Sequence, residues 1–242
     1  GVYALAADIE DLAARGREPV EDRQATLDDW EAALEGRREA DTPTLRALAH
    51  SLQRQQLLLD PLKNLIEGGR RATRGEQPEH FGELMEYVRL RGIPLTRQYL
   101  HQKGITDPET LARGDALGSA LGLLDIYFGL GRETRARGTS WLPADEMERF
   151  RVSAEAVAKG ETQIGLRQMM RHQLQRTLGV LNSGAVLTRQ VGILWGLPLR
   201  LVVLRAWQLG QRFQQQPGFF QPPRLKAGDW PIVLWRAVKA GF

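Results

Sequence analysis

Acidic side chains gather in two places where their types and spacing suit metal chemistry. Asp8 and Asp11 lie three residues apart near the start of the chain, and Asp125 and Glu133 lie in its middle. Acids three or four apart share one face of a helix, and Mg²⁺ prefers carboxylate oxygens. Two such helices facing each other could hold a Mg²⁺–diphosphate group between them. The alternative for the first pair is a solvated helical turn that binds nothing.

The rest of the composition excludes other chemistries. The chain of 242 residues has no cysteine, which excludes disulfides, thiolate zinc sites and a cysteine nucleophile. Its four histidines are never spaced as HxxxH, and neither a GxSxG motif nor a Walker A loop occurs. Of the basic residues 28 are arginine and five are lysine, and the net charge of +4 is too small and too evenly spread to favour nucleic acid as a partner.

Helix signals dominate the elements that must position the acids. Thr42, Asp60 and Asp107 each precede a proline, as a capping residue does before a first helical turn. Apolar residues recur at helical spacing and no β alternation stands out, so the sequence predicts an all-α fold. We expect one domain over 1–242, whose start at Gly1 rather than Met leaves a shortened N-terminus open. The expected helices are 2–14, 26–36, 43–57, 61–72, 79–91, 95–103, 108–131, 144–149, 153–181, 184–194, 198–215 and 230–239, and the Gly- and Arg-rich stretches 67–76 and 131–140 are interpreted as loops within one domain.

Three glycines form a stripe along one of these helices. Gly114, Gly118 and Gly122 are four residues apart, and each glycine in a helix costs about 1 kcal/mol relative to alanine. One explanation is a close crossing with another helix, since small residues let backbones approach. The other is a low groove wall against which a long apolar ligand lies.

The C-terminal third contains the most apolar segments. Residues 191–209 form the most hydrophobic run, but Pro198, Arg200 and Arg205 interrupt it, so a membrane-spanning helix is not expected. A buried core helix is one interpretation, and contact with a membrane surface is the other. The cluster of Phe219, Phe220, Trp230, Trp235 and Phe242 beside basic residues allows the same two interpretations: packing of a last helix, or a membrane interface. We expect a cytoplasmic protein, with peripheral contact at the inner membrane face as a hypothesis.

Segments in order along nearly the whole chain resemble motifs of the squalene/phytoene synthase family, the all-α head-to-head prenyl synthases. The resemblance implies an isoprenoid-synthase helical bundle with a central apolar cavity, Mg²⁺ as cofactor and a prenyl diphosphate such as farnesyl diphosphate as partner. The resemblance depends on the order and spacing of these segments taken together. The segments are 3–11, similar to the tyrosine-led, aspartate-rich first motif, then 27–34, 84–92, 117–126 at the second aspartate motif, 138–146 and 196–204.

The resemblance also implies roles for individual residues. Catalytic roles fall on Tyr87 and Asp125, and Mg²⁺ binding falls on Asp8, Asp11 and Glu133. Substrate binding falls on Arg70, Arg71, Arg74, Gly118, Gly122 and Phe128.

The departures from the family pattern bear on activity. Ala7 and Gly129 stand where each motif has its leading aspartate, and Phe128 stands where the second motif has an arginine. Arginines occur around 70–74 where the family has a methionine–aspartate pair, and they could hold phosphate directly. Hard cations need several carboxylates, so these changes remove charge from both sides of the expected clamp. Three hypotheses follow: a divergent prenyl-diphosphate synthase, a non-catalytic relative that binds lipid or helps assembly, and a helical protein without an isoprenoid link.

Overall fold

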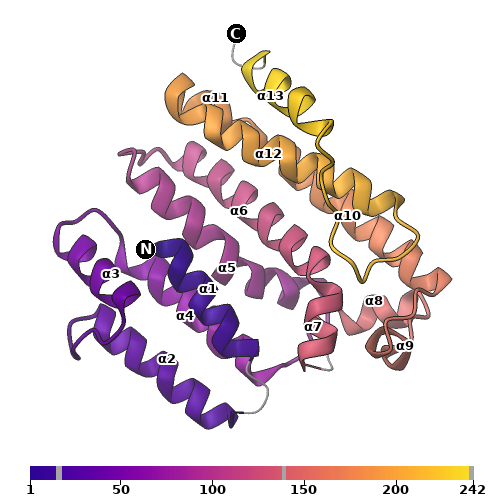
Figure 1. The fold of residues 1–242 in the computed structure, drawn as a ribbon, viewed down its shortest axis with the longest axis horizontal. Helices are drawn as coiled ribbons and strands as arrows, with labels where there is room; N and C mark the ends of the chain where they lie inside the picture. The colour runs from indigo at the N-terminus through magenta and orange to yellow at the C-terminus, as the bar shows by residue number, and fades with distance from the viewer. Residues whose placement is uncertain (15–17, 138–139, 240–242) are drawn as a thin grey trace.

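The computed structural model describes residues 1–14, 18–137 and 140–239, and in these ranges it is built of helices without strands (Figure 1). The all-α prediction is therefore confirmed. Gly138, Thr139 and Phe242, which belong to predicted motifs, lie outside the described residues. The helices are α1 (Val2–Ala14), α2 (Val20–Leu34), α3 (Pro43–Gln53), α4 (Leu59–Arg74), α5 (Phe81–His101), α6 (Pro108–Phe128), α7 (Leu130–Arg137), α8 (Ala144–Arg149), α9 (Ala154–Ala158), α10 (Ile164–Ala185), α11 (Leu187–Gln190), α12 (Gly192–Gln215) and α13 (Asp229–Lys239).

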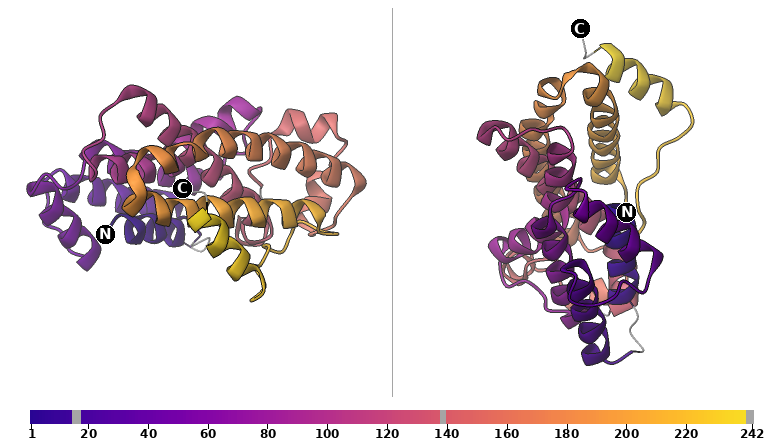
Figure 2. Two further views of the ribbon diagram at one scale, coloured as in Figure 1. Left: turned by 90° about the horizontal axis from the view of Figure 1, so that it is seen from above. Right: turned by 90° about the vertical axis from the view of Figure 1, so that its left-hand side faces the viewer.

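The helices pack in a sequence that follows the chain. Helix α4 packs on α5, α5 on α6, and α6 on α10. Helices α1 and α2 cover α4, while α12 packs on α10 and carries α13. Seen from the side, α12 and α13 lie at the end of the molecule opposite α2 (Figure 2).

Two hydrophobic cores hold this arrangement together. The smaller core joins α1 to α4 and includes the fully enclosed Leu27, Leu48 and Leu62. The larger core runs from α5 to α12 and includes Tyr127 and Phe213. The apolar run 191–209 forms about the first three quarters of α12, where Val203 and Ala206 are buried in the larger core whereas Leu194 and Trp195 are exposed.

The crossing of α5 and α6 is unusually close. A Cβ atom added to Gly92 would lie 2.0 Å from the carbonyl oxygen of Gly118, and one added to Gly118 would lie 2.7 Å from the carbonyl oxygen of Gly92. Only glycine at both positions permits this approach. Of the two explanations for the glycine stripe, the close crossing therefore holds at Gly118.

The helix ends follow from local chemistry at the caps. The Thr42 side chain accepts from the amide of Leu45 at 3.1 Å, and Asp107 accepts from the amide of Thr110 at 2.8 Å, each before a proline. Two expected starts are wrong. Helix α4 begins at Leu59, so Asp60 lies inside its first turn, and α2 begins at Val20, six residues before Thr26.

Prolines end fewer helices than expected. Helix α5 runs through Pro94 and α12 runs through Pro198, although each proline removes a backbone hydrogen bond. Burial of α5 between α4 and α6 offsets that loss. The helix expected over 153–181 is divided instead, because Gly160 takes a φ of +73° after α9 and the chain restarts as α10 at Ile164. Both expected loops are mostly helical, because 67–76 belongs to α4 as far as Arg74 and 131–140 belongs to α7 as far as Arg137.

Candidate functional site

A cavity of about 790 Å³ lies between the two cores. Helices α1 and α4 form one wall, and α5, α6 and α12 form the other. Most of the lining is apolar or small, including Ala6, Leu65, Leu95, Leu121 and Val202. The predicted central apolar cavity is thus present, and it has the size of a site for an extended small molecule.

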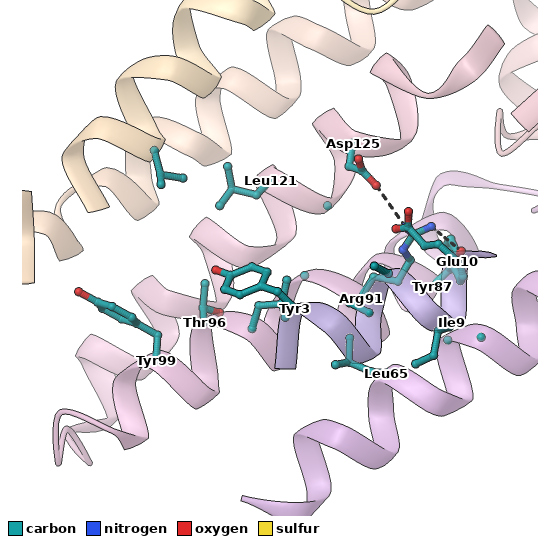
Figure 3. Close-up of a pocket in the computed structure, with 18 of the residues that line it drawn as sticks. Tyr3, Ile9, Glu10, Leu65, Tyr87, Arg91, Thr96, Tyr99, Leu121 and Asp125 are labelled. Carbon is teal, nitrogen blue, oxygen red and sulfur yellow. Dashed lines mark hydrogen bonds and ion pairs between the residues drawn. The ribbon is translucent and has the colours of Figure 1, made fainter. Parts of the chain in front are cut away.

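Charged groups gather at one end of this cavity (Figure 3). We call Glu10 of α1, Arg91 of α5 and Asp125 of α6 the polar end. Arg91 Nη2 donates to Glu10 Oε1 and, at 3.2 Å, to Asp125 Oδ2. Arg91 Nη1 donates to the hydroxyl of Tyr87 at 2.8 Å. Figure 3 shows these side chains pointing toward one another, whereas Tyr3 and Tyr99 lie away from them along the cavity.

The charge states at the polar end follow from burial and pairing. Burial disfavours the cationic form of Arg91, but Tyr87, Asp125 and Glu10 outweigh it and raise the arginine pKa. Arg91 is therefore a permanent cation. Burial raises the pKa of Glu10, against the opposing effect of Arg91, and the negative charges of Asp125 and Glu133 raise it further. Glu133, on α7, thus belongs electrostatically to the same neighbourhood without lining the cavity.

Tyr87 is fixed in place by an aromatic partner. Its ring stacks on Trp141 with centroids 3.8 Å apart and planes at 8°. The tyrosine separates the main cavity from a second, more polar pocket of about 520 Å³, which it also lines. Such stacking holds the hydroxyl toward Arg91.

The structure brings some of the predicted site residues together. Tyr87, Asp125 and Gly122 line the main cavity. Asp8 is half buried and Asp11 is exposed, and neither lines the cavity, because α1 turns Glu10 toward it instead. Glu133 is buried beside Arg132, whose Nε lies 3.4 Å from Glu133 Oε1.

The predicted arginine trio is divided between two places. Arg70 bonds to Asp28 and Glu31 of α2, both at 2.6 Å, on the side of α4 that faces α2. Arg71 and Arg74 line the second pocket, where Arg71 pairs with Glu86 at 3.5 Å. None of the three lines the main cavity.

The two remaining substrate predictions lie behind the cavity wall. Phe128 packs edge-on against Phe213 of α12, with ring centroids 5.1 Å apart. Gly118 is occupied by the crossing with Gly92. The roles assigned to these residues from the family resemblance stay predictions.

The donors at the polar end do not fit a magnesium cluster. The Arg91 guanidinium lies between Glu10 and Asp125 and bonds to both, so a divalent cation there would meet a fixed positive charge. Within the described ranges, no group of three or more acidic or histidine side chains is close enough to hold one ion.

Two members of the polar end were missed by sequence reasoning. Glu10 lies inside the acidic segment 8–11. Arg91 follows Tyr87 by four residues, and this spacing places Tyr87 and Arg91 on one face of a helix. That spacing was a usable signal for Arg91. No signal in the sequence distinguishes Glu10 from its acidic neighbours.

Comparisons with known proteins agree with the fold. The family model for squalene/phytoene synthase matches residues 1–230. Phytoene synthases from Synechococcus elongatus and Zea mays are each 30% identical, over 168 and 164 residues. These matches cover 63% and 62% of this chain, and 54% and 38% of the relatives. The chain thus spans about half the length, or less, of the curated relatives it matches.

Solved structures show the same architecture. The squalene synthase HpnC from Alicyclobacillus acidocaldarius superposes with a TM-score of 0.75 at 24% identity, covering 91% of this chain and 82% of that one. A dehydrosqualene synthase crystallised with a ligand gives a TM-score of 0.76 at 18% identity, covering 99% and 84%. These structures share the fold, and the match of the family model over residues 1–230 establishes that the chain belongs to the squalene/phytoene synthase family.

Proposed function

We propose that this chain binds a long isoprenoid ligand in the main cavity and does not turn over prenyl diphosphates. The single observation that carries the proposal is the cavity itself: about 790 Å³, lined mostly by apolar and small side chains, with its lining acids bonded to an arginine. An extended hydrocarbon buries its surface against such a lining. This proposal corresponds to the second hypothesis of the sequence analysis, a non-catalytic relative that binds lipid or helps assembly.

Two features of the motifs support the absence of turnover. Ala7 and Gly129 replace the leading aspartates that the family resemblance expects. Glu10 and Asp125, the acids that do line the cavity, are engaged by Arg91. Ionisation of a prenyl diphosphate requires positive charge on the leaving group, and the guanidinium at the polar end is already shared between carboxylates.

The test compares two substitutions on α1. Ala6 lines the cavity, whereas Ala4 is exposed. Ala6→Phe should fill the cavity and abolish binding of farnesol and farnesyl diphosphate in isothermal titration, while Ala4→Phe should leave binding unchanged. Equal binding by both variants contradicts the proposal. Diphosphate release from farnesyl diphosphate with Mg²⁺, above a heat-treated control, contradicts the absence of turnover.

A second candidate is a Mg²⁺-dependent prenyltransferase that uses farnesyl diphosphate. It is favoured by the position of the cavity between the acid-bearing helices α1 and α6, with Tyr87, Asp125 and Gly122 in its lining. Metal binding would require Arg91 to leave the carboxylates. The same diphosphate-release assay decides it, and release that disappears in Asp125→Asn would establish it.

A membrane surface is the further partner we propose. Helix α13 exposes Ile232, Leu234, Trp235 and Val238, next to the exposed basic residues Arg236 and Lys239. Apolar side chains rimmed by cations suit the interface of an anionic bilayer. In the described part of the chain, no helix combines the length and apolar character needed to cross a membrane. Flotation with anionic liposomes tests the proposal, and protein that stays entirely in the bottom fraction at low salt contradicts it.

A further inference from the structure

We infer that the polar end of the main cavity selects an isoprenoid whose head is an uncharged hydrogen-bond donor, such as an alcohol, over a prenyl diphosphate. The inference rests on the proposed function, because it concerns the head of the ligand whose chain occupies the cavity. It follows from three properties of the site: which donors are already used, which acceptors face the cavity, and how the charges balance.

Both terminal nitrogens of the arginine at the polar end already donate hydrogen bonds to the protein. Nη1 of Arg91 bonds to the Tyr87 hydroxyl, and Nη2 is shared between Glu10 and Asp125. The side chain is 16% exposed, so its reorientation toward solvent is restricted. A diphosphate that used Nη2 of this guanidinium would have to displace two carboxylates, each of which is held by its own helix.

The groups that face a ligand at this end are acceptors. Asp125 is 51% exposed at the side chain and Glu10 is 39% exposed, so both carboxylates keep lone pairs for another partner. A carboxylate accepts hydrogen bonds and donates none when ionised. A hydroxyl can donate to either carboxylate, whereas a diphosphate oxygen that faces them meets like charge.

Acids outnumber cations around the polar end. The charged groups that act on Glu10 are the acids Asp125 and Glu133 and the cations Arg91 and Arg132. Arg132 lies 3.9 Å from Glu10 and is mostly exposed. With three acids against two cations, the polar end does not attract a multiply charged anion. The excess of one negative charge lies on partly exposed carboxylates, where water screens it, so a cation gains little.

The experiment uses three probes with the same chain: farnesol, farnesylamine and farnesyl diphosphate. Affinities are measured by titration calorimetry on the full chain, with Mg²⁺ and with EDTA. We expect farnesol to bind at least about tenfold more tightly than either charged probe in both conditions. Tighter binding of the amine or of the diphosphate, with or without Mg²⁺, overturns the inference while leaving the proposed function standing. If no probe binds, the proposed function fails as well.

A double variant tests the cause of this selectivity. Glu10→Gln with Asp125→Asn removes two negative charges and releases Arg91, so affinity for farnesyl diphosphate should rise about tenfold. Farnesol affinity should fall, because the acceptors for its hydroxyl lose their charge and the arginine that orients them. The matched control is Glu21→Gln with Asp22→Asn, which removes the same charge from exposed positions of α2. An equal gain in the control, or no gain in the cavity variant, overturns the inference. Arg205 of α12 lines the cavity, and Arg205→Gln is also tested as a single substitution. If it abolishes binding of farnesyl diphosphate, Arg205 recognises the diphosphate, and this result would also contradict the inference.

Discussion

Two regions of this molecule contain nearly the same types of side chain but have different roles. The polar end sets Arg91 and Tyr87 beside Glu10 and Asp125, at the wall of a cavity. A second group lies inside the larger core, and we call it the inner network. It consists of Tyr127 of α6, Glu146 of α8, and Gln173 and Arg176 of α10. Both regions join helices that are far apart in sequence.

Members of the inner network hydrogen-bond to one another. The Tyr127 hydroxyl donates to Gln173 at 2.8 Å, Gln173 donates to Glu146, and Arg176 donates to Glu146 at 3.0 Å. Gln173 and Tyr127 are fully buried, and burial raises the pKa of the tyrosine. The guanidinium of Arg176 also lies 3.2 Å above the ring of Phe81.

The difference teaches where polar groups become a site. In the inner network every acceptor faces another protein group, so the bonds link α6, α8 and α10 and contribute to stability. At the polar end the carboxylates are partly exposed to a cavity, so they have capacity left for a ligand. The role of a polar cluster therefore depends less on its residue types than on whether a cavity lies beside it.

The largest expected effect comes from a change that disrupts both regions at once. Helix α5 carries Arg91 of the polar end, and α6 carries Asp125 of the polar end and Tyr127 of the inner network; Gly92→Leu would force the two helices apart at their crossing. We expect a loss of about 4 kcal/mol or more in the free energy of unfolding, because backbone atoms are in the way. Urea unfolding measures it. Gly179 of α10 has open space around it, so Gly179→Ala is the control and should be neutral or stabilising. Similar stability of both variants would refute the close crossing.

The next effect separates the inner network from the cavity. Gln173→Leu leaves the Tyr127 hydroxyl and one oxygen of Glu146 without their partner, which should lower the free energy of unfolding by about 3 kcal/mol. Binding of farnesol should be unchanged at a temperature where the variant is folded. Gln168 is exposed on the same helix, and Gln168→Leu should change stability by less than about 0.5 kcal/mol. Lost ligand binding in a folded Gln173→Leu protein would contradict the separation of the two regions.

Arg91→Gln removes the cation of the polar end and leaves its two carboxylates in place. Because Glu10 and Asp125 are partly hydrated, we expect a loss of only about 1 kcal/mol in stability, less than for Gln173→Leu. Farnesol affinity should fall by about tenfold, since the carboxylates lose the group that orients them. Arg89 is exposed on the same helix, and Arg89→Gln should change neither quantity. A stability loss larger than that of Gln173→Leu would make the polar end mainly a structural group.

The smallest effect on stability is expected at a surface that belongs to neither region. Ile232 and Trp235 of α13 are 51% and 60% exposed. Replacing both with glutamine should change the free energy of unfolding by less than about 0.5 kcal/mol and leave farnesol binding intact. Flotation with anionic liposomes should nevertheless be lost. Unchanged flotation would show that α13 is not the membrane-contacting surface.

Much of the fold could be predicted from local signals. Capping at Thr42 and Asp107 predicted the starts of α3 and α6, because a side-chain oxygen bonds an amide within the same turn. The continuation of α5 through Pro94 could not be predicted, because burial between two neighbouring helices offsets the lost hydrogen bond. The start of α2 at Val20 was missed because no side-chain cap marks it.

The candidate site was predicted less completely. Tyr87, Asp125 and Gly122 were expected from the family resemblance and line the cavity. Glu10 and Arg91 were not among the expected residues. Which side of α1 faces the cavity depends on how Leu5 and Leu12 pack into the smaller core, and that packing involves partners as distant as Leu62.

The amino-acid sequence by itself determined the all-α class, most helix positions and the family to which the chain belongs, because helical periodicity and caps act over a few residues. Only the tertiary structure decided that Arg91 stands between Glu10 and Asp125, and that Arg70 faces α2 rather than the cavity. The physical reason is that ion pairing depends on distances between helices whose approach is set by side chains far along the chain, such as Gly92 against Gly118.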